Sequence, residues 1–503
     1  MLFQTLFLAL PMLAAATSSP GFFPQKNAEN VNPDTHLVLT FNEVPTLGEK
    51  GLISVYDAKD GSLVDQLDLS IPAGPTRGRQ YGPECDYMKT PYDYTRTTVP
   101  TNKDTKPGTP SCGATATYDD GNYQLTIIGG FTDGFHFHPV LVRDTTAIIY
   151  LHNNMLEYGH EYYVTIDNGA IKCGNFKGVK KNEWKFKTKA NGPKDPRNIT
   201  VNCNGTADFN TVQGALDFVP DWSDEKTVIN IARGEYEEIV YFRNKSNVVI
   251  RGEGMDKTIV HYANSEVFNP HPLNYKTNEK RGTFPSRRAA FTVDNCRDIT
   301  IEDIYIATDS WGQAEGILVN GERVAIYRSM LVGTGDAWQL NGTVYLEGCT
   351  LDGAGDSMLG RGSVFAYRCH FLNGGGPMSW VRNFAPDHGD VFVECLMETK
   401  SGKGMFDYGR TNTQSYTSYP DAEFVVIDCR VRNLNPKGWS HIGVPTQTML
   451  EFNTRDADTG ELVDTSQRDP FSRQLDAVKD AETIRNYRNP AYVLKGWNPR
   501  LDK

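Results

Sequence analysis

The sequence predicts an all-β protein in which a β-sandwich is followed by a parallel β-helix. The first observation is composition, because 46 Gly, 24 Tyr and 24 Phe among 503 residues are typical of a turn-rich β protein. The second is a series of short alternating strands between residues 28 and 190. The third is a strand pattern that repeats through the rest of the chain without intervening helices.

Charge and hydropathy exclude several classes of protein. The net charge is −11 and no run of Lys or Arg occurs, which argues against a nucleic-acid partner. Apolar residues at 39% and charged residues at 22% are the proportions of a folded chain, not of a disordered one. After the N-terminus no apolar stretch reaches the about 18 residues of a spanning helix, so no membrane partner is expected.

Residues 1–16 are predicted to be a signal peptide that does not belong to the fold. The segment from Leu2 to Ala16 is apolar, ends in three alanines and is followed by polar sequence. A buried N-terminal strand or an anchor is the alternative. A secreted, extracellular protein is therefore expected. Four N-glycosylation sequons fit that route: Asn198, Asn204, Asn244 and Asn341.

Residues 28–190 are predicted to form the β-sandwich. Apolar and polar residues alternate there in short segments, and Asp60-Gly61 is a hairpin signal. The clearest segments are 37–41, 51–56, 162–166 and 184–189. The pattern resembles the Ig-like modules that precede catalytic domains in secreted enzymes of bacterial type. Residues 190–196 (ANGPKDP) are expected to be the linker.

The cysteine and histidine pattern predicts no metal. The nine cysteines match no metal-ligand spacing, and their odd number leaves at least one thiol unpaired within the chain if the others are oxidised. His136 and His138 alternate along one expected strand and could hold a metal, although exposure to solvent is the simpler expectation.

From residue 198 onward the same strand pattern recurs, which is the mark of a solenoid. Six runs share it: 298–306, 323–331, 343–351, 363–371, 390–398 and 423–431. Their alignment, with successive spacings of 20 to 34 residues, gives one column: Ile304, Ser329, Cys349, Cys369, Cys395 and Cys429. A parallel β-helix with this column as a ladder of small interior residues fits best. A Cys349–Cys369 bridge between neighbouring coils is the alternative.

Two aspartates occupy equivalent positions of successive repeats. Asp336 and Asp356 each lie five residues after a strand run, and their separation of 20 residues equals the local repeat. Equivalent positions of a parallel β-helix stack about 4.8 Å apart, so the two carboxylates are expected to be neighbours. One of them is then expected to act as an acid and the other as a base or nucleophile. Two ordinary surface turns are the alternative. Gln313 is expected one coil earlier on the same side, as an oxyanion donor.

The second region resembles the pectin methylesterase family. Its opening, ADFNTVQGALDFVP (207–220), precedes further motifs in the family's order between residues 198 and 500. They are GEYEEIVY (234–241), VIRGEGMDKTIV (249–260), WGQAEG (311–316), GDAWQL (335–340), GDSMLG (355–360), YGR (408–410), NPKGW (435–439) and DTSQRDPFSRQL (464–475). The resemblance implies a right-handed, single-stranded parallel β-helix over residues 198–503 and the chemistry of an aspartyl esterase.

The resemblance also implies residue roles. Asp356 matches the Asp of the DFIFG-like motif, which is the nucleophile, and Asp336 matches the Asp of the QDTL-like motif, the general acid and base. Gln313 matches the glutamine of the QAVA-like motif, an oxyanion donor. Arg410 matches the arginine of the LGRPW-like motif, which holds the nucleophilic carboxylate.

The chain departs from the family pattern in several motifs. Gly335 stands where the QDTL-like motif has a second glutamine, and losing an oxyanion donor typically costs about 10²–10³ in rate. Gln339 is a candidate replacement, and no aromatic residue follows Arg410. Four tryptophans could stack on a sugar or pack in the core: Trp311, Trp338, Trp380 and Trp439. The residues expected to bind substrate are Trp338, Gln339 and Trp439.

The sequence therefore predicts a secreted pectinesterase that removes methyl esters from the galacturonic acid residues of pectin. Its expected partner is pectin or a related uronic-acid polysaccharide, with no cofactor, and it is expected to be a monomer. Three alternatives are open. They are an esterase or thioesterase of the same family for a different ester, a catalytically weakened pectin-binding protein, and a pectin-cleaving hydrolase or lyase on the same solenoid.

Overall fold

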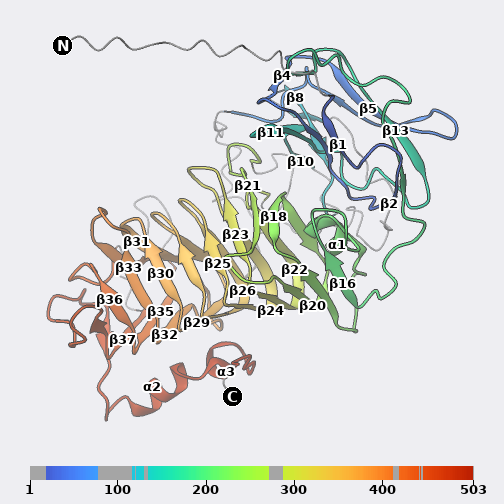
Figure 1. The fold of residues 1–503 in the computed structure, drawn as a ribbon. Helices are drawn as coiled ribbons and strands as arrows, with labels where there is room; N and C mark the ends of the chain where they lie inside the picture. Colours follow the sequence, from blue (N-terminus) through green and yellow to red (C-terminus); the bar gives the residue numbers. More distant parts are fainter. Residues whose placement is uncertain are drawn as a thin grey trace, which may run out of the picture.

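The computed structural model describes residues 19–76, 116–118, 121–129, 134–270, 287–411, 419–440, 442 and 446–501. Within these ranges the chain forms an N-terminal β-sandwich and a longer stack of parallel strands, which lie side by side (Figure 1). The predicted signal peptide, Cys85 and Cys112 fall outside the described residues. None of the described helices is long and apolar enough to span a bilayer.

The N-terminal part packs two sheets around one apolar core. The first has the order β1-β3-β12-β11, with β1 (Gly21–Phe23), β3 (Leu37–Thr40), β12 (Thr146–Ile149) and β11 (Val140–Arg143). The second has the order β2-β15-β13-β5-β6, with β2 (Ala28–Val31), β15 (Lys185–Thr188), β13 (Glu161–Ile166), β5 (Leu52–Asp57) and β6 (Leu63–Asp68). Alternate residues of both sheets, such as Leu39 and Val164, are buried between them.

The strands predicted from alternation are present in this part, and the Asp60-Gly61 hairpin joins β5 to β6. Three short pairs complete it: β4 (Thr46–Leu47) with β14 (Ile171–Lys172), β7 (Ala116–Tyr118) with β8 (Gly121–Tyr123), and β9 (Leu125–Thr126) with β10 (Phe135–His136). Its Ig-like character and the domain limits stay predictions.

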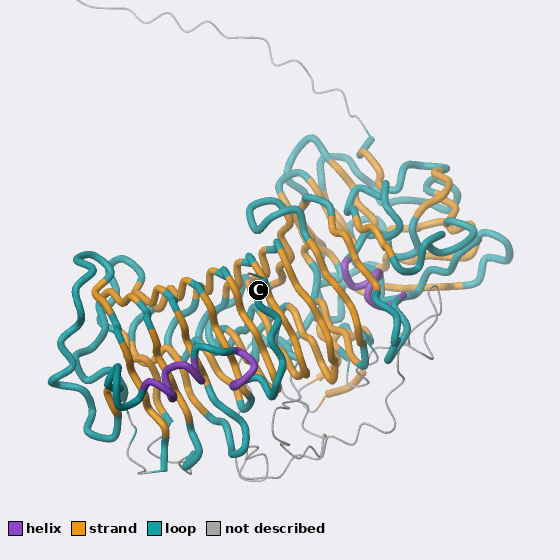
Figure 2. Tube along the Cα trace, turned by 90° about the horizontal axis from the view of Figure 1, so that it is seen from below, coloured by secondary structure: helices purple, strands orange, loops and turns teal. Residues whose placement is uncertain are grey.

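The second part is the predicted parallel β-helix, and Figure 2 shows its strands stacked along one axis. The larger sheet contains β16 (Asn198–Val201), β17 (Thr227–Ile231), β20 (Ser246–Arg251), β22 (Phe291–Glu302), β24 (Ile317–Tyr327), β26 (Trp338–Glu347), β29 (Ser363–Tyr367), β32 (Asp390–Val393), β35 (Glu423–Ile427), β37 (Thr448–Phe452) and β39 (Arg473–Gln474). Four strands extend it around a bend: β19 (Val240–Arg243), β28 (Met358–Gly360), β31 (Gly376–Val381) and β34 (Phe406–Arg410).

The smaller sheet forms another side of the β-helix. It contains β18 (Gly234–Glu237), β21 (Thr258–Tyr262), β23 (Tyr305–Thr308), β25 (Met330–Val332), β27 (Thr350–Asp352), β30 (His370–Asn373), β33 (Leu396–Thr399), β36 (Arg430–Arg432) and β38 (Arg455–Asp456). Two C-terminal helices, α2 (Ala481–Tyr487) and α3 (Pro490–Val493), cover the outer face of the larger sheet through a separate apolar cluster (Figure 1).

Each predicted strand run in the β-helix is two strands that meet at a corner. The corner residue has a left-handed backbone, with φ between 44° and 64°, in six successive coils: Asp303, Arg328, Gly348, Arg368, Glu394 and Asp428. The next residue in each coil belongs to the predicted column, and the register of the smaller sheet confirms that column from Ile304 to Cys429. A turn that repeats with the same handedness keeps the coils in register.

The alternative of a Cys349–Cys369 bridge is wrong, because both thiols are free and buried. Stacked side chains point in parallel into the interior, so their Cβ atoms keep the strand spacing of about 4.8 Å. A disulfide needs about 3.8 Å between Cβ atoms. The column therefore serves as an apolar ladder.

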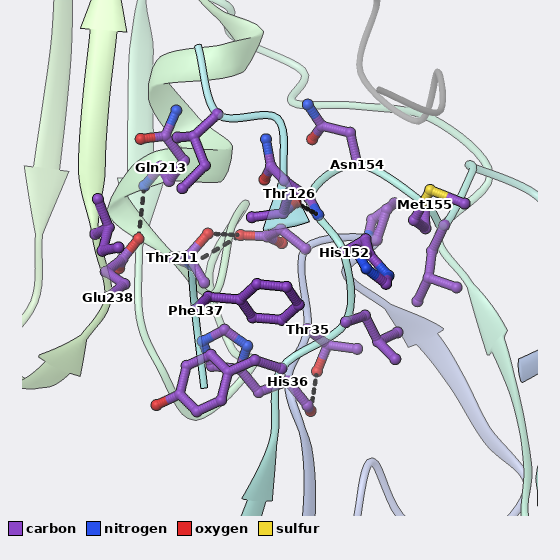
Figure 3. A pocket seen from close by; sticks show the side chains of 18 of the residues that line it. Thr35, His36, Thr126, Phe137, His152, Asn154, Met155, Thr211, Gln213 and Glu238 are labelled. Carbon is purple, nitrogen blue, oxygen red and sulfur yellow. Dashed lines mark hydrogen bonds between the residues drawn. The ribbon is translucent and has the colours of Figure 1, made fainter. Parts of the chain in front are cut away.

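The β-sandwich contacts the β-helix at α1 (Val212–Phe218), where two carboxylates meet the start of the helix. Asp34 accepts a hydrogen bond from the backbone nitrogen of Thr211 (2.8 Å), and Glu238 accepts one from the backbone nitrogen of Val212 (2.8 Å). Both carboxylates line the cavity of Figure 3. Burial raises the pKa of Asp34 to about 6 and that of Glu238 to about 7.

The expectation that His136 and His138 face solvent is wrong. His136 is fully buried, with Nδ1 2.5 Å from the carbonyl oxygen of Phe268, and His138 stacks on the Phe268 ring. The segment that carries them packs against the turn around Phe268 in the β-helix, a contact that the alternation of residues within one strand cannot reveal. In the part of the chain that the structure describes, no group of three His, Cys, Asp or Glu residues could hold a metal ion.

This junction is expected to lose stability as the pH rises. A carboxyl whose pKa is raised by folding stabilises the fold fully below its ordinary value (3.8 for Asp34, 4.5 for Glu238) and loses that contribution as the pH rises through about 6 to 7. Thermal unfolding from about pH 4 to 8 should show a falling Tm, and Asp34→Asn should flatten the fall. Asp60→Asn, in an exposed turn, is the control. An unchanged slope in Asp34→Asn would contradict the prediction.

Candidate active site

Asp336 and Asp356 occupy equivalent positions of two successive coils. Asp336 lies four residues after β25 and two before β26, and Asp356 stands in the same relation to β27 and β28. The register pairs Val332 with Asp352 and Trp338 with Met358, on either side of the two aspartates. Their side chains are partly exposed, at 15% for Asp336 and 22% for Asp356. Both carboxylates therefore lie on one edge of the β-helix where a ligand can reach them.

Asp356 is held by Arg410, the last residue of β34. The Nε atom of Arg410 lies 2.8 Å from Oδ1 and 3.1 Å from Oδ2 of Asp356, and Nη2 donates to Oδ2 as well. The guanidinium also stacks on Trp380, its neighbour on β31, at 4.3 Å from the ring centroid. A bidentate contact backed by an aromatic face fixes both the direction of the carboxylate and the charge beside it.

Asp336 is held by a second arginine that the sequence analysis missed. Nη2 of Arg288 lies 3.2 Å from Oδ2 of Asp336 and 2.6 Å from Oε1 of Glu315. The Asp336 backbone has φ of 63°, a left-handed conformation that costs energy in a non-glycine residue and that concentrates at functional sites. The two aspartates thus have different surroundings, since Arg410 faces one and an Arg288–Glu315 pair faces the other.

Glu315 continues the row of carboxylates into the preceding coil. It lies two residues before β24, and Ile317 of β24 pairs with Trp338 of β26, so Glu315 is the equivalent of Asp336. The equivalence of Glu315 and Asp336 could have been found from the sequence, because the 21 residues that separate them are one coil of the repeat. Glu315 is fully buried, and that burial raises its pKa to about 7.

Gln313 lies on the turn of the same preceding coil, with an exposed side chain. Thr334 ties this turn to the Asp336 turn, because its hydroxyl donates to the carbonyl oxygens of Ser310 and Gly312 at 3.1 Å each. Gly335 accepts a hydrogen bond from the nitrogen of Ala314 (3.2 Å). A Cβ atom at Gly335 would lie 3.3 Å from the carbonyl oxygen of Gly312, so a side chain there needs only a small shift.

The four tryptophans separate into two groups. Trp338 and Trp439 are fully buried in the interior core, which contradicts the expectation that they bind substrate. Trp338 and Leu340 are two residues apart on β26, so their side chains point to the same, inner face of the strand. Trp311 is 84% exposed on the Gln313 turn, and Trp380 is half-buried beside Arg410. The surface rings of the site are therefore Trp311 and Trp380.

Gln339 lies on the outward row of β26, in register with Leu359 and then with Trp380 of the next coils. Its side chain has no exposed surface, and neither amide atom has a hydrogen-bond partner in the described structure. The structure therefore does not present Gln339 to a ligand on an open surface, although its amide is free to take a partner.

A row of carboxylates beside two arginines on a parallel β-helix supplies groups suited to acid–base chemistry. Residues 198–389 match the family model described as Pectinesterase. This match confirms the resemblance that the motifs indicate, and it supports a carboxylic ester hydrolase.

Curated relatives and solved structures are similar over the same share of the chain. Pectinesterase 31 of Arabidopsis thaliana is 24% identical over 287 residues, which cover 56% of this chain and 88% of the relative. Probable pectinesterase A of Aspergillus niger is 26% identical over 298 residues, which cover 57% and 84%. Pectin methylesterase from carrot superposes with a TM-score of 0.49 at 18% identity, covering 61% of this chain and 95% of that one.

Arg410→Lys should lower the turnover of an ester substrate by about 10–100-fold, because lysine keeps the charge but loses the planar fork and the stacking on Trp380. The measurement is kcat with purified protein. Arg432→Lys is the matched control, since Arg432 pairs with Asp458 in an exposed turn. Equal turnover of Arg410→Lys and the wild type would show that the bidentate contact has no role in the reaction.

Proposed function

We propose that the protein hydrolyses the methyl esters of galacturonic acid residues in pectin. The observation that carries the proposal is the in-register pair of Asp336 and Asp356 within a pectinesterase domain, each beside its own arginine. The names of the matched relatives support pectin as the substrate class.

In the proposed first step, Asp356 is the nucleophile. One of its oxygens attacks the ester carbonyl carbon, and the carbonyl electrons move to the oxygen. The exposed amide of Gln313, on the adjoining turn, donates a hydrogen bond to that oxyanion. When the tetrahedral intermediate collapses, the C–O bond to the methoxy group breaks and Asp336 gives its proton to the leaving group. The products are methanol and an anhydride between Asp356 and the galacturonosyl carboxyl group.

The second step reverses these roles. Asp336, now ionised, takes a proton from a water molecule that attacks the anhydride carbonyl. The anhydride C–O bond breaks, the galacturonate product leaves, and Asp356 is regenerated as a carboxylate held by Arg410. Asp336 carries a proton again and is ready for the next ester. One water is consumed and one methanol and one acid are produced, so no cofactor is needed for the balance.

The missing glutamine at Gly335 points to weakened oxyanion stabilisation, since Gln313 is then the single donor that the motifs supply. Gln339 is the candidate second donor because its amide lacks a partner among the described residues. Rearrangement on substrate binding would be required, because its side chain is fully buried.

Secretion is part of the proposal. It is supported by the apolar segment 2–16 and by two sequons, Asn198 and Asn204, whose side chains are exposed. Asn244 and Asn341 are buried and cannot accept a glycan in the folded protein. The exported protein would then meet pectin directly.

Methanol release from highly methylated pectin is the direct test. Asp356→Asn should abolish release, and Gly335→Gln should raise kcat by up to about 10²-fold if the second oxyanion donor is restored. Asp298→Asn, at a distant surface pair with Arg323, is the control. Polymer binding without methanol release would favour a binding protein. Hydrolysis of small acyl esters without preference for pectin would favour an esterase for a different ester.

Trp311→Ala should raise KM for the polymer with little change in kcat, because the exposed ring is placed to stack on a sugar next to the site rather than to touch the reacting ester. The loss expected for one stacking ring is about 3–10-fold in KM. Trp222→Ala, at a tryptophan that is 44% exposed, is the control. A fall in kcat at unchanged KM would contradict a role in binding.

A further inference from the structure

A cavity lies at the junction between the β-sandwich and the β-helix (Figure 3). Its volume of about 90 Å³ exceeds what one water molecule needs. The β-sandwich lines it with Asp34, Phe137 and His152 among others, and the β-helix lines it with Glu238 and Ile239. A ligand bound there would therefore contact both parts of the chain.

The two carboxyl groups of the wall accept hydrogen bonds from neutral donors. Oδ2 of Asp34 accepts from the backbone nitrogens of Asn210 (2.9 Å) and Thr211 (2.8 Å) and from the Thr211 hydroxyl (2.8 Å). Glu238 accepts from two backbone nitrogens at the start of α1, at 2.8 and 2.9 Å. Burial lowers the pKa of His36, which also lines the cavity, to about 4, so this ring is uncharged near neutral pH. No lysine or arginine is among the described lining residues, so the charge of the wall is negative.

Two buried acceptor atoms of lining residues have no partner among the described residues. They are Oδ1 of Asp34 and Nε2 of His152. The His152 side chain is only 4% exposed, and its Nδ1 lies 2.6 Å from Oδ1 of Asp65. A carboxylate beside Nδ1 favours the tautomer with the proton on that nitrogen, which leaves a lone pair on Nε2. Buried acceptors without donors cost free energy, so this wall suits a ligand that brings N–H groups.

Much of the remaining wall is apolar. In the view of Figure 3 the Phe137 ring lies between His152 and Glu238. Ile128 and Ile239 are buried and line the cavity as well. A few polar atoms within apolar walls are the usual form of a site for a small organic molecule.

We propose that this cavity binds a small organic cation, a protonated primary amine on a short apolar body. The ammonium group supplies positive charge and three N–H donors for the unpartnered acceptors, and the body packs against Phe137 and the aliphatic side chains. An anion is repelled by the carboxylates, and a neutral alcohol brings a single donor. None of the lining residues belongs to the row of Glu315, Asp336 and Asp356, so the inference does not depend on the proposed esterase reaction.

Isothermal titration calorimetry of the full chain with n-butylammonium, n-butanol and butyrate tests the choice of ligand. The three probes share one apolar body and differ in the charge of the head group. At about pH 8, above the pKa values of both carboxyl groups, n-butylammonium should bind at least about 10-fold more tightly than n-butanol, and butyrate should bind least. Equal or tighter binding of n-butanol or butyrate would overturn the choice of a cation. No binding of any probe would show that the cavity holds water alone.

A matched pair of variants tests the place of binding. Met155→Trp puts a larger side chain in the cavity wall and should abolish the binding of n-butylammonium. Met255→Trp, at a methionine that is 43% exposed and does not line the cavity, should bind like the wild type. Unchanged binding in Met155→Trp, or equal losses in both variants, would overturn the site.

Asp34→Asn tests the role of charge within the site. The substitution keeps the shape of the side chain and removes its negative charge, so n-butylammonium should bind about 10-fold more weakly while n-butanol is unaffected. Thermal unfolding first checks that this variant is folded, and if it is not, the methionine pair decides. An equal loss for both probes in the folded variant would contradict recognition of a cation by Asp34.

Discussion

In-register stacking of each coil on the next is the constraint on which the rest of the structure depends. Parallel strands fix neighbouring coils at about 4.8 Å, so residues one coil apart become side-chain neighbours whatever their chemistry. Inside, this spacing gives a buried column that Ser329 and Cys349 share with the thiols of later coils. On the edge, the same spacing brings Glu315, Asp336 and Asp356 into one row. The left-handed corner residue in successive coils keeps both sets aligned.

A row of carboxylates at that spacing requires compensating charge, and the β-helix supplies it from coils on either side. Arg410 reaches Asp356 from two coils further along the larger sheet. Arg288 lies one coil before Glu315 and two coils before Asp336, and it reaches both. The repeat therefore determines which acidic side chains lie next to one another. The arginines of neighbouring coils determine how the charges of these acids are balanced. Trp380 adds a flat apolar surface that holds Arg410 against Asp356.

Much of this arrangement could be predicted from the sequence because it follows from the repeat. The column ending at Cys429 and the equivalence of Asp336 and Asp356 come from spacing alone, and both appear in the structure. Spacing says nothing of contacts between positions that differ in the repeat, and Arg288 was missed for that reason. The burial of Trp338 follows from strand parity, whereas Trp439 lies outside any strand and is buried by packing alone.

The unequal arginine contacts of the acids at this edge connect the structure to its proposed chemistry. Asp356 lies beside Arg410, whereas Asp336 shares Arg288 with the buried carboxyl group of Glu315. Ester cleavage by a carboxylate nucleophile needs a proton for the leaving methoxide, at a pH where the nucleophile stays ionised. In the proposed reaction Asp356 is the nucleophile and Asp336 supplies the proton. The difference between one arginine partner and a shared one is the structural feature that we propose separates the roles of the two stacked aspartates.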